Sequence, residues 1–160
     1  MGARSRGSET ALVALFKAAD RVQAFLASVV EPHGITVQQY NVLRILRGAE
    51  PTGLPTLTIA DRMIERAPGI TRMIDRLEAR RLVARERRSD DRRCVHCRIS
   101  AEGLELLRRL DRPVLQGDEI AFAKLTAAER AQLTALLGRV CPGDAGRQHQ
   151  PVDRNRAIRG

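Results

Sequence analysis

Hydrophobic residues recur at intervals of three and four along most of this chain, which is the spacing of one face of an α-helix. The spacing is present at 10–30, 37–47, 57–64 and 68–80, and twice within 101–140. The pattern therefore predicts a mainly helical protein with a long leading helix, a central group of shorter helices and two trailing helices.

The third and fourth helical segments are separated by a proline, which predicts two helices and not one. Ala67 precedes Pro68, and the residue before a proline disfavours the α conformation, whereas proline itself suits the first position of a helix. The apolar side of 68–80 consists of Ile70, Met73, Ile74 and Leu77. The other side carries Thr71, Arg72 and Arg76. Small polar and arginine side chains on the free face of a helix suit the reading of bases in the major groove.

After Arg81 the period changes from that of a helix to that of a strand. Segments 82–87 and 94–99 are predicted as two strands, joined by the charged turn 88–93, and 54–56 is a candidate edge strand that contains a proline. Two helices followed by a β-hairpin form a winged helix-turn-helix. The predicted fold class is therefore mainly α with a small β-wing (α+β), in which the winged module is flanked by N- and C-terminal helices.

Three polar residues mark the predicted starts of helices. Thr36, with Gln39 three positions later, and Thr126, with Glu129, both match the capping box, and Ser100 is a good N-cap for the helix that follows. Pro113 lies within that helix and is expected to kink or interrupt it.

Composition narrows the class of partner. The 28 Lys and Arg residues against 19 Asp and Glu residues give a net charge of +9, which favours polyanions without separating DNA from RNA or an anionic membrane. Aromatic residues make up only 2%, which argues against RNA-recognition sheets and single-strand binders, because both rely on aromatic stacking. No uncharged run approaches the ~18 residues of a membrane span, and the N-terminus has no signal-peptide pattern. A cytoplasmic protein is therefore expected.

Two runs of the sequence resemble the MarR family. The run DRRCVHCRISAEG at 91–103 is similar to the family's wing-to-helix signature, and PGITRMIDRLE at 68–78 is similar to its recognition helix. The resemblance covers about 10–140 and implies a homodimeric bacterial transcription regulator, most commonly a repressor. It further implies that many members release DNA when they bind a small ligand, often aromatic and anionic.

The resemblance also implies a division of the chain. The DNA-binding winged helix would occupy about 36–100, and the dimerisation helices about 10–31 and 101–140. A basic mobile arm is expected at 1–9 and a disordered basic tail at 141–160. The sequence departs from the family pattern at Arg81, where a glycine commonly closes the recognition helix, so a less regular helix end is expected there.

Candidate DNA-binding residues come from the recognition helix and from the wing. They are Pro68, Gly69, Thr71, Arg72, Arg76, Arg88, Arg92 and Arg93. The helix start offers backbone N–H groups to a phosphate, the helix arginines could contact guanine or phosphate, and arginines of a wing suit a narrow minor groove. In the family pattern one arginine of the DRR motif binds DNA, which favours Arg92. The alternatives are a solvated helix face and an exposed hairpin held by weak surface ion pairs.

Dimerisation and ligand binding are assigned only through the resemblance. The candidate dimerisation residues are Leu12, Leu15, Phe16, Leu133, Leu136 and Leu137. The candidate ligand-binding residues are Phe16, Phe25, His33, Tyr40 and Arg44, on helices that would surround a pocket. For each of the latter, an ordinary core or surface role is the favoured interpretation.

The run Cys94-Val95-His96-Cys97 invites a metal or redox interpretation. On a strand the two cysteines would point to opposite faces, and a second ligand pair is missing from the sequence, so no metal and no cofactor are predicted. Cys94, beside Arg92 and Arg93, leaves a thiol-based redox-sensing regulator open as an alternative. A non-specific architectural DNA-binding protein is the other alternative. No recognisable catalytic constellation is present, so an enzyme is not expected.

Overall fold

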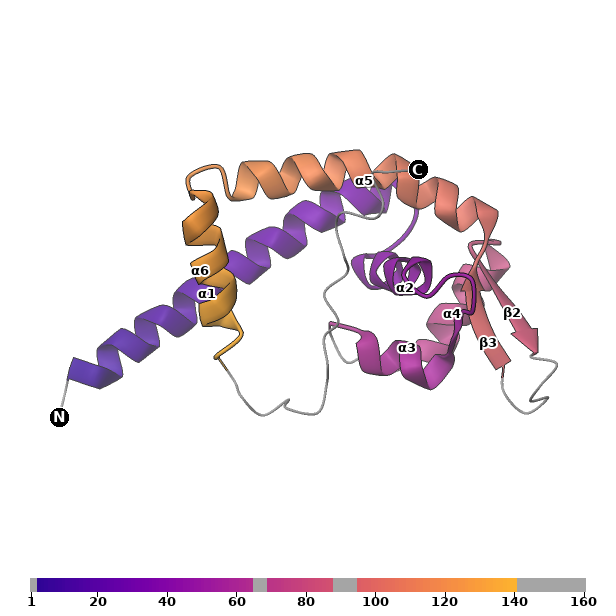
Figure 1. The fold of residues 1–160 in the computed structure, drawn as a ribbon, viewed down its shortest axis with the longest axis horizontal. Coiled ribbons are helices and arrows are strands. Elements are labelled where there is room, and N and C mark those ends of the chain that lie inside the picture. Colours follow the sequence, from indigo (N-terminus) through magenta and orange to yellow (C-terminus); the bar gives the residue numbers. More distant parts are fainter. Residues whose placement is uncertain (1–2, 65–68, 88–94, 141–160) are drawn as a thin grey trace.

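The computed structural model describes residues 3–64, 69–87 and 95–140 of the 160-residue chain. The elements in order are α1 (Ala3–Val30), the 3-10 helix η1 (Glu31–His33), α2 (Val37–Arg47), β1 (Leu54–Pro55), α3 (Thr56–Arg62), α4 (Ile70–Ala79), β2 (Val83–Arg87), β3 (Val95–Ile99), α5 (Ala101–Ala121) and α6 (Ala127–Leu137). The long helices α1 and α5 lie along one side, and α2, α3, α4 and the sheet gather at one end of them (Figure 1). The predicted fold class is confirmed.

The sheet is antiparallel with strand order β1-β3-β2. Val83 pairs with Ile99, and Leu54 pairs with Cys97. The edge position of β1 accommodates Pro55, which lacks a backbone donor. Both predicted hairpin strands are present: β2 begins one residue later than expected, and β3 covers the described part of the second strand.

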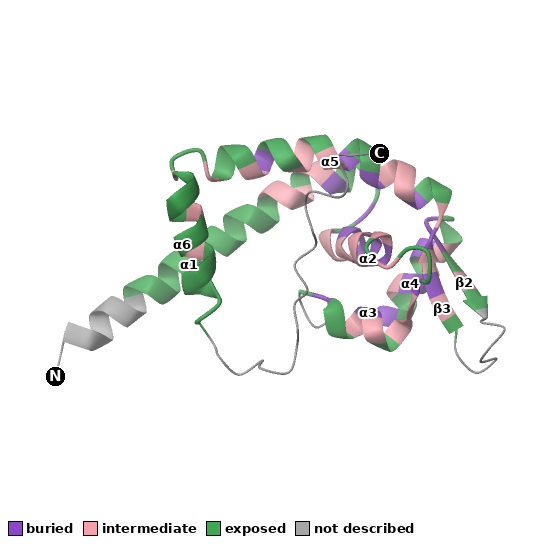
Figure 2. Ribbon diagram, viewed as in Figure 1, coloured by how far each residue is buried: buried purple, intermediate pink, exposed green. Residues whose placement is uncertain are grey.

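One hydrophobic core lies inside the winged module and is closed by α5. Its fully buried side chains include Val42, Leu43, Leu46, Ile59, Ile74, Leu77, Leu107 and Leu110. Buried residues concentrate at the end of the molecule formed by α2, α4 and the sheet, whereas most of α1 and α6 is exposed (Figure 2). The core thus lies mainly in the winged module and is completed by α5, and the flanking helices leave much of their surface open.

Three helix bounds differ from expectation. α1 begins at Ala3, so the helix includes most of the stretch expected to be a mobile arm. α3 ends at Arg62 and α4 begins at Ile70, with Pro68 outside the described residues. α5 runs through Pro113 without interruption, because Leu110 and Gly117 on either side of the proline are both buried against the rest of the fold. Tertiary packing here outweighs the hydrogen bond that proline removes.

The predicted helix starts are confirmed by their hydrogen bonds. The Thr36 hydroxyl accepts from the Gln39 N–H at 3.2 Å, and the Gln39 side chain accepts from the Thr36 N–H at 3.0 Å. Ser100 accepts from the Gly103 N–H at 3.0 Å. Thr126 and Glu129 form a second capping box, whose hydrogen bonds to the carboxylate lower the pKa of Glu129.

The end of α4 is regular, contrary to the expectation for Arg81. The Arg81 N–H donates to the Glu78 carbonyl at 2.8 Å and the Leu82 N–H donates to the Leu77 carbonyl at 2.9 Å, which is the Schellman pattern. Arg81 has φ 59°, the left-handed conformation that this motif demands. An L-residue other than glycine pays about 1–2 kcal/mol for that conformation.

Replacing Arg81 by glycine is therefore expected to raise the free energy of unfolding. The gain should be about 0.5–1 kcal/mol, since the relief of backbone strain exceeds the extra entropy of glycine in the unfolded chain. Urea denaturation followed by circular dichroism measures the change. Arg81→Ala is the control, because it removes the same side chain but keeps the strain. Equal stability of the two variants would contradict the strain argument.

Candidate DNA-binding surface

The exposed face of α4 carries the residues predicted to contact DNA. Thr71, Arg72 and Arg76 are exposed, while Ile70, Ile74 and Leu77 are buried on the opposite side. This division follows from the helical spacing of the apolar residues. The predicted recognition helix therefore has its predicted orientation relative to the core.

The start of α4 is open. Gly69 is the N-cap residue, exposed and in the left-handed conformation with φ 93°, and it supplies no side-chain cap to the first N–H groups of the helix. A Cβ atom built on Gly69 would meet no atom within 4 Å. The positive end of the helix dipole, whose first N–H groups receive no side-chain cap from Gly69, thus lies beside Thr71 and Arg72, an arrangement that suits a phosphate.

The two acidic residues of α4 share an ion pair with one arginine from the wing. Arg85 on β2 contacts Asp75 at 2.6 Å and Glu78 at 2.6 Å, and its backbone N–H donates to Glu78 at 3.3 Å. The hydrogen bond to Asp75 is the largest cause of the raised pKa of Arg85, so this contact favours the charged guanidinium. Asp75 therefore braces Arg85, and in the described part of the chain neither Arg72 nor Arg76 has an ion-pair partner. No helical or strand periodicity in the sequence links Arg85 to Asp75 and Glu78, so the sequence did not indicate that it pairs with them.

The wing strands are tied to the loop after α2. Arg98 on β3 contacts Glu86 at 3.1 Å and Glu50 at 3.6 Å, and the His96 ring lies 3.2 Å from the Thr52 carbonyl. The contacts of Arg98 with Glu50 and of His96 with Thr52 hold β3 against the loop that follows α2. The wing candidates Arg88, Arg92 and Arg93 lie outside the described residues, so their contact with a minor groove stays a prediction.

The cysteine pair is only partly described. Cys97 is fully buried, with its sulfur 3.6 Å from the Thr56 hydroxyl. Cys94 lies outside the described residues, so the redox alternative is untested. Among the residues that the structure does describe, no three His, Cys, Asp or Glu side chains form a group that could hold a metal ion.

Among the ligand-binding candidates, one contact is described. Arg44 lies over the ring of Tyr40, 5.8 Å from its centroid, and burial raises the pKa of the Tyr40 phenol. Phe25 packs against Gly117 on α5. Phe16 lies on α1 about 20 Å before the end of that helix, at 1.5 Å per residue, whereas His33 lies beyond that end. Contact is thus shown for Tyr40 and Arg44, and ligand binding by the whole set stays a prediction.

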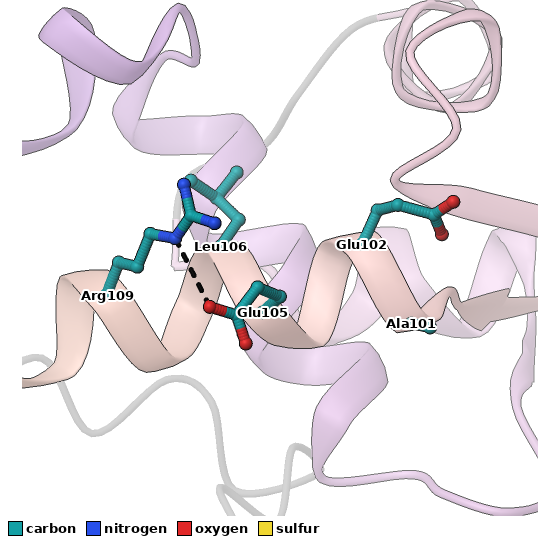
Figure 3. Close-up of a pocket in the computed structure, with 5 residues that line it drawn as sticks. All are labelled: Ala101, Glu102, Glu105, Leu106 and Arg109. Carbon is teal, nitrogen blue, oxygen red and sulfur yellow. Dashed lines mark hydrogen bonds and ion pairs between the residues drawn. The ribbon is translucent and has the colours of Figure 1, made fainter.

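A shallow pocket on α5 is unrelated to these candidates. Its lining residues are Ala101, Glu102, Glu105, Leu106 and Arg109. Arg109 contacts Glu105 at 3.2 Å across it (Figure 3). All five residues come from one stripe of a single helix, and the only cation among them is paired. The pocket contains none of the residues predicted to bind DNA or a ligand.

Apolar side chains are exposed on α1, α5 and α6. Of the predicted dimerisation residues, Leu133 is half-buried and the others, Leu12, Leu15, Phe16, Leu136 and Leu137, are exposed. The other exposed apolar residues on these helices, which were not among the predicted dimerisation residues, are Val13, Val22, Leu115 and Ile120. Exposed apolar surface of this extent on helices is typical of an interaction site. No helix in the described ranges is both long enough and apolar enough to span a membrane.

Comparison with known proteins agrees with this geometry. A sequence model of the MarR family matches residues 35–95, which is most of the winged module. The crystal structure of a MarR transcription factor from Planctomyces limnophilus is 40% identical, with 81% of this chain and 93% of that chain covered and a TM-score of 0.63. This chain belongs to the MarR family.

MarR-family relatives of known role are similar along most of their length. The homoprotocatechuate degradative operon repressor of Escherichia coli is 29% identical over 78% of this chain and 83% of its own. A cysteine-to-serine mutant of MarR from E. coli, solved in complex with operator DNA, is 26% identical over 80% of this chain and 91% of its own, with a TM-score of 0.71. The protein is accordingly a MarR-type DNA-binding transcription regulator.

Proposed function

We propose that this MarR-family protein is a homodimeric repressor that binds a pseudo-palindromic operator. Each protomer would place α4 in the major groove, and the two helices would address grooves one helical turn, about 34 Å, apart. The observation that carries the proposal is the exposed face of α4, on which Arg72 and Arg76 are unpaired within the described chain while Arg85 pairs with both Asp75 and Glu78. The charges of Arg72, Arg76 and Arg85 together outweigh those of the two carboxylates, so this face presents net positive charge to the phosphates. Such a regulator would act in the bacterial cytoplasm.

The proposed partner for the exposed apolar face of α1, α5 and α6 is a second copy of this chain. The exposed residues come from both ends of the sequence, and they lie on helices whose surface is largely exposed away from the core (Figure 2). A two-fold interface would bury the same patch on both protomers. It would also supply the second recognition helix, without which only half of a palindrome is read.

Regulation by a small aromatic or anionic effector is a further part of the proposal. Tyr40 and Arg44 on α2 offer an aromatic ring beside a guanidinium group, which is the chemistry that an aromatic acid requires. A thermal-shift screen of aromatic carboxylic acids tests this point. A ligand that raises the melting temperature of the wild type, but not of Arg44→Ala, is the expected result.

Selection of binding sites from a random duplex library tests the proposed function. The wild-type protein is expected to enrich a single pseudo-palindromic sequence, with half-sites about one helical turn apart. A non-specific architectural protein would bind the library without enrichment. The absence of an enriched sequence would therefore refute the repressor proposal.

Replacing Arg72 by alanine is expected to weaken specific binding more than non-specific binding. The loss should be about 1–3 kcal/mol against the selected duplex, since a bidentate arginine contact with guanine contributes that much discrimination. Fluorescence anisotropy with the selected and a scrambled duplex measures both affinities. Arg109→Ala is the control, because it removes the same charge from a residue of α5 that lies outside the proposed DNA-binding surface. Equal losses for both duplexes would identify Arg72 as a phosphate contact only.

A further inference from the structure

The side chain of Arg80, at the end of α4, contacts the chain segment that follows α1. Arg80 is the C-cap residue of α4, and its guanidinium donates to the His33 carbonyl at 3.0 Å and also to the Gly34 carbonyl. These residues form the junction between α1 and α2. One side chain thus joins the recognition helix to the junction that ends the first helix.

The junction is shaped to receive this side chain. Carbonyl groups at the end of a helix have no partner within the helix, so the two groups that Arg80 contacts are acceptors that need an external donor. Gly34 has φ 75°, and a Cβ atom there would lie 3.2 Å from one guanidinium nitrogen and 3.4 Å from the other. Glycine therefore allows the left-handed turn and also leaves room for the guanidinium.

The junction itself is firmly anchored. Val30 before it and Ile35 after it are both buried in the core. By contrast, α4 packs mainly on α3 and β2, the neighbouring elements of the winged module. The Arg80 contacts are therefore a direct link between α4 and the chain segment that carries α1, the helix proposed to dimerise.

We propose that Arg80 is a positioning residue for DNA binding: it holds α4 at a fixed position relative to α1 and so sets the spacing between the two recognition helices of the dimer. The inference rests on the proposed homodimer and its two-part operator. Arg80 acts through the His33 and Gly34 carbonyls and not through a base or a phosphate. Its loss should therefore affect the preference for half-site spacing more than the affinity for one half-site.

The test compares Arg80→Met with Arg81→Met, which removes the same charge from the adjacent exposed residue. Anisotropy titrations use the duplex selected by the wild type, the same duplex with one or two base pairs inserted between half-sites, and a single half-site. We expect Arg80→Met to lose about tenfold in affinity for the selected spacing, as for the loss of a charge-assisted hydrogen bond. The affinity of Arg80→Met for a single half-site should stay unchanged. The difference in its affinity between the selected spacing and the duplexes with inserted base pairs should become smaller than in the wild type. Arg81→Met should retain the wild-type discrimination.

Salt dependence separates this role from a phosphate contact. Removing one phosphate contact lowers the slope of log affinity against log salt concentration by about one, whereas loss of a positioning contact leaves the slope unchanged. A reduced slope in Arg80→Met, with full recovery in Arg80→Lys, would overturn the inference. Unchanged discrimination between spacings in Arg80→Met would overturn it as well.

A second variant approaches the same contact from the other side. Gly34→Asn adds a Cβ against the guanidinium at a left-handed position that asparagine tolerates, and it changes no charge. It should narrow the discrimination between spacings as Arg80→Met does. A Gly34→Asn protein that folds and keeps wild-type discrimination would count against the inference even if Arg80→Met failed to fold. If the wild type selects no two-part site at all, the proposed function fails first.

Discussion

Replacing Gly103 by alanine is expected to lower the free energy of unfolding by about 3 kcal/mol, at the upper end of overpacking effects. A Cβ atom at this position would lie 2.3 Å from the Leu82 carbonyl oxygen and 2.7 Å from the Ile99 side chain. The same carbonyl accepts a hydrogen bond from the Ser100 N–H at 3.1 Å, which joins the start of the wing to the start of α5. Because the obstacle is backbone, the first turn of α5 would have to move away from the sheet.

Urea denaturation of Gly103→Ala and Gly48→Ala measures this effect against a matched control. Gly48 ends α2 with φ −69°, and an added Cβ would come no closer than 3.6 Å to any neighbour. Gly48→Ala should therefore be neutral or raise stability by about 0.4–1 kcal/mol through the unfolded state. A loss below about 1 kcal/mol in Gly103→Ala would mean that α5 is less tightly fixed to the wing than the close approach implies.

Replacing Phe16 by aspartate is expected to convert the proposed dimer into monomers. The Phe16 side chain is 68% exposed on α1, and the two-fold symmetry of a dimer would place both new carboxylates in the interface. Burial of two unpaired charges should raise the dimer dissociation constant by at least about 1000-fold. Loss of the dimer should then lower affinity for the full operator by roughly 100-fold or more, because the two recognition helices are no longer joined and each binds its half-site separately.

Sedimentation equilibrium gives the mass of each variant. Leu57→Asp is the control for oligomeric state, since Leu57 is 77% exposed on α3, outside the proposed interface. This variant should remain dimeric, whereas Phe16→Asp should sediment as a monomer that retains the wild-type circular dichroism spectrum. A dimeric Phe16→Asp protein would place the interface elsewhere.

Local signals explain why much of the fold could be predicted from the sequence. The capping residues Thr36, Ser100 and Thr126 act within three positions of themselves, so their hydrogen bonds follow from the sequence alone. The burial of one face of α4 follows from spacing in the same way. Pro113 and Arg81 show the limit of this reasoning. Packing against distant parts of the fold allows α5 to continue through Pro113, and the Schellman turn after α4 accepts an arginine in the left-handed conformation.

The parts of the site that the sequence could not reveal depend on partners distant along the chain. Arg85 contacts Asp75, which lies ten positions away in the sequence. Arg80 donates to the carbonyls of His33 and Gly34, which lie more than forty positions away. No periodicity links such pairs. Asp75 contacts Arg85 of β2 and not Arg72 or Arg76 of its own helix. This pairing matters for function, because it leaves Arg72 and Arg76 unpaired within the described chain.

Hydroxyl-radical footprinting of the wild-type protein on its selected duplex tests the central claim most directly. A homodimer with one α4 helix in each of two successive major grooves predicts two protected stretches, related by a two-fold centre and about one helical turn apart. A single protected stretch, or uniform protection along the duplex, would contradict the account.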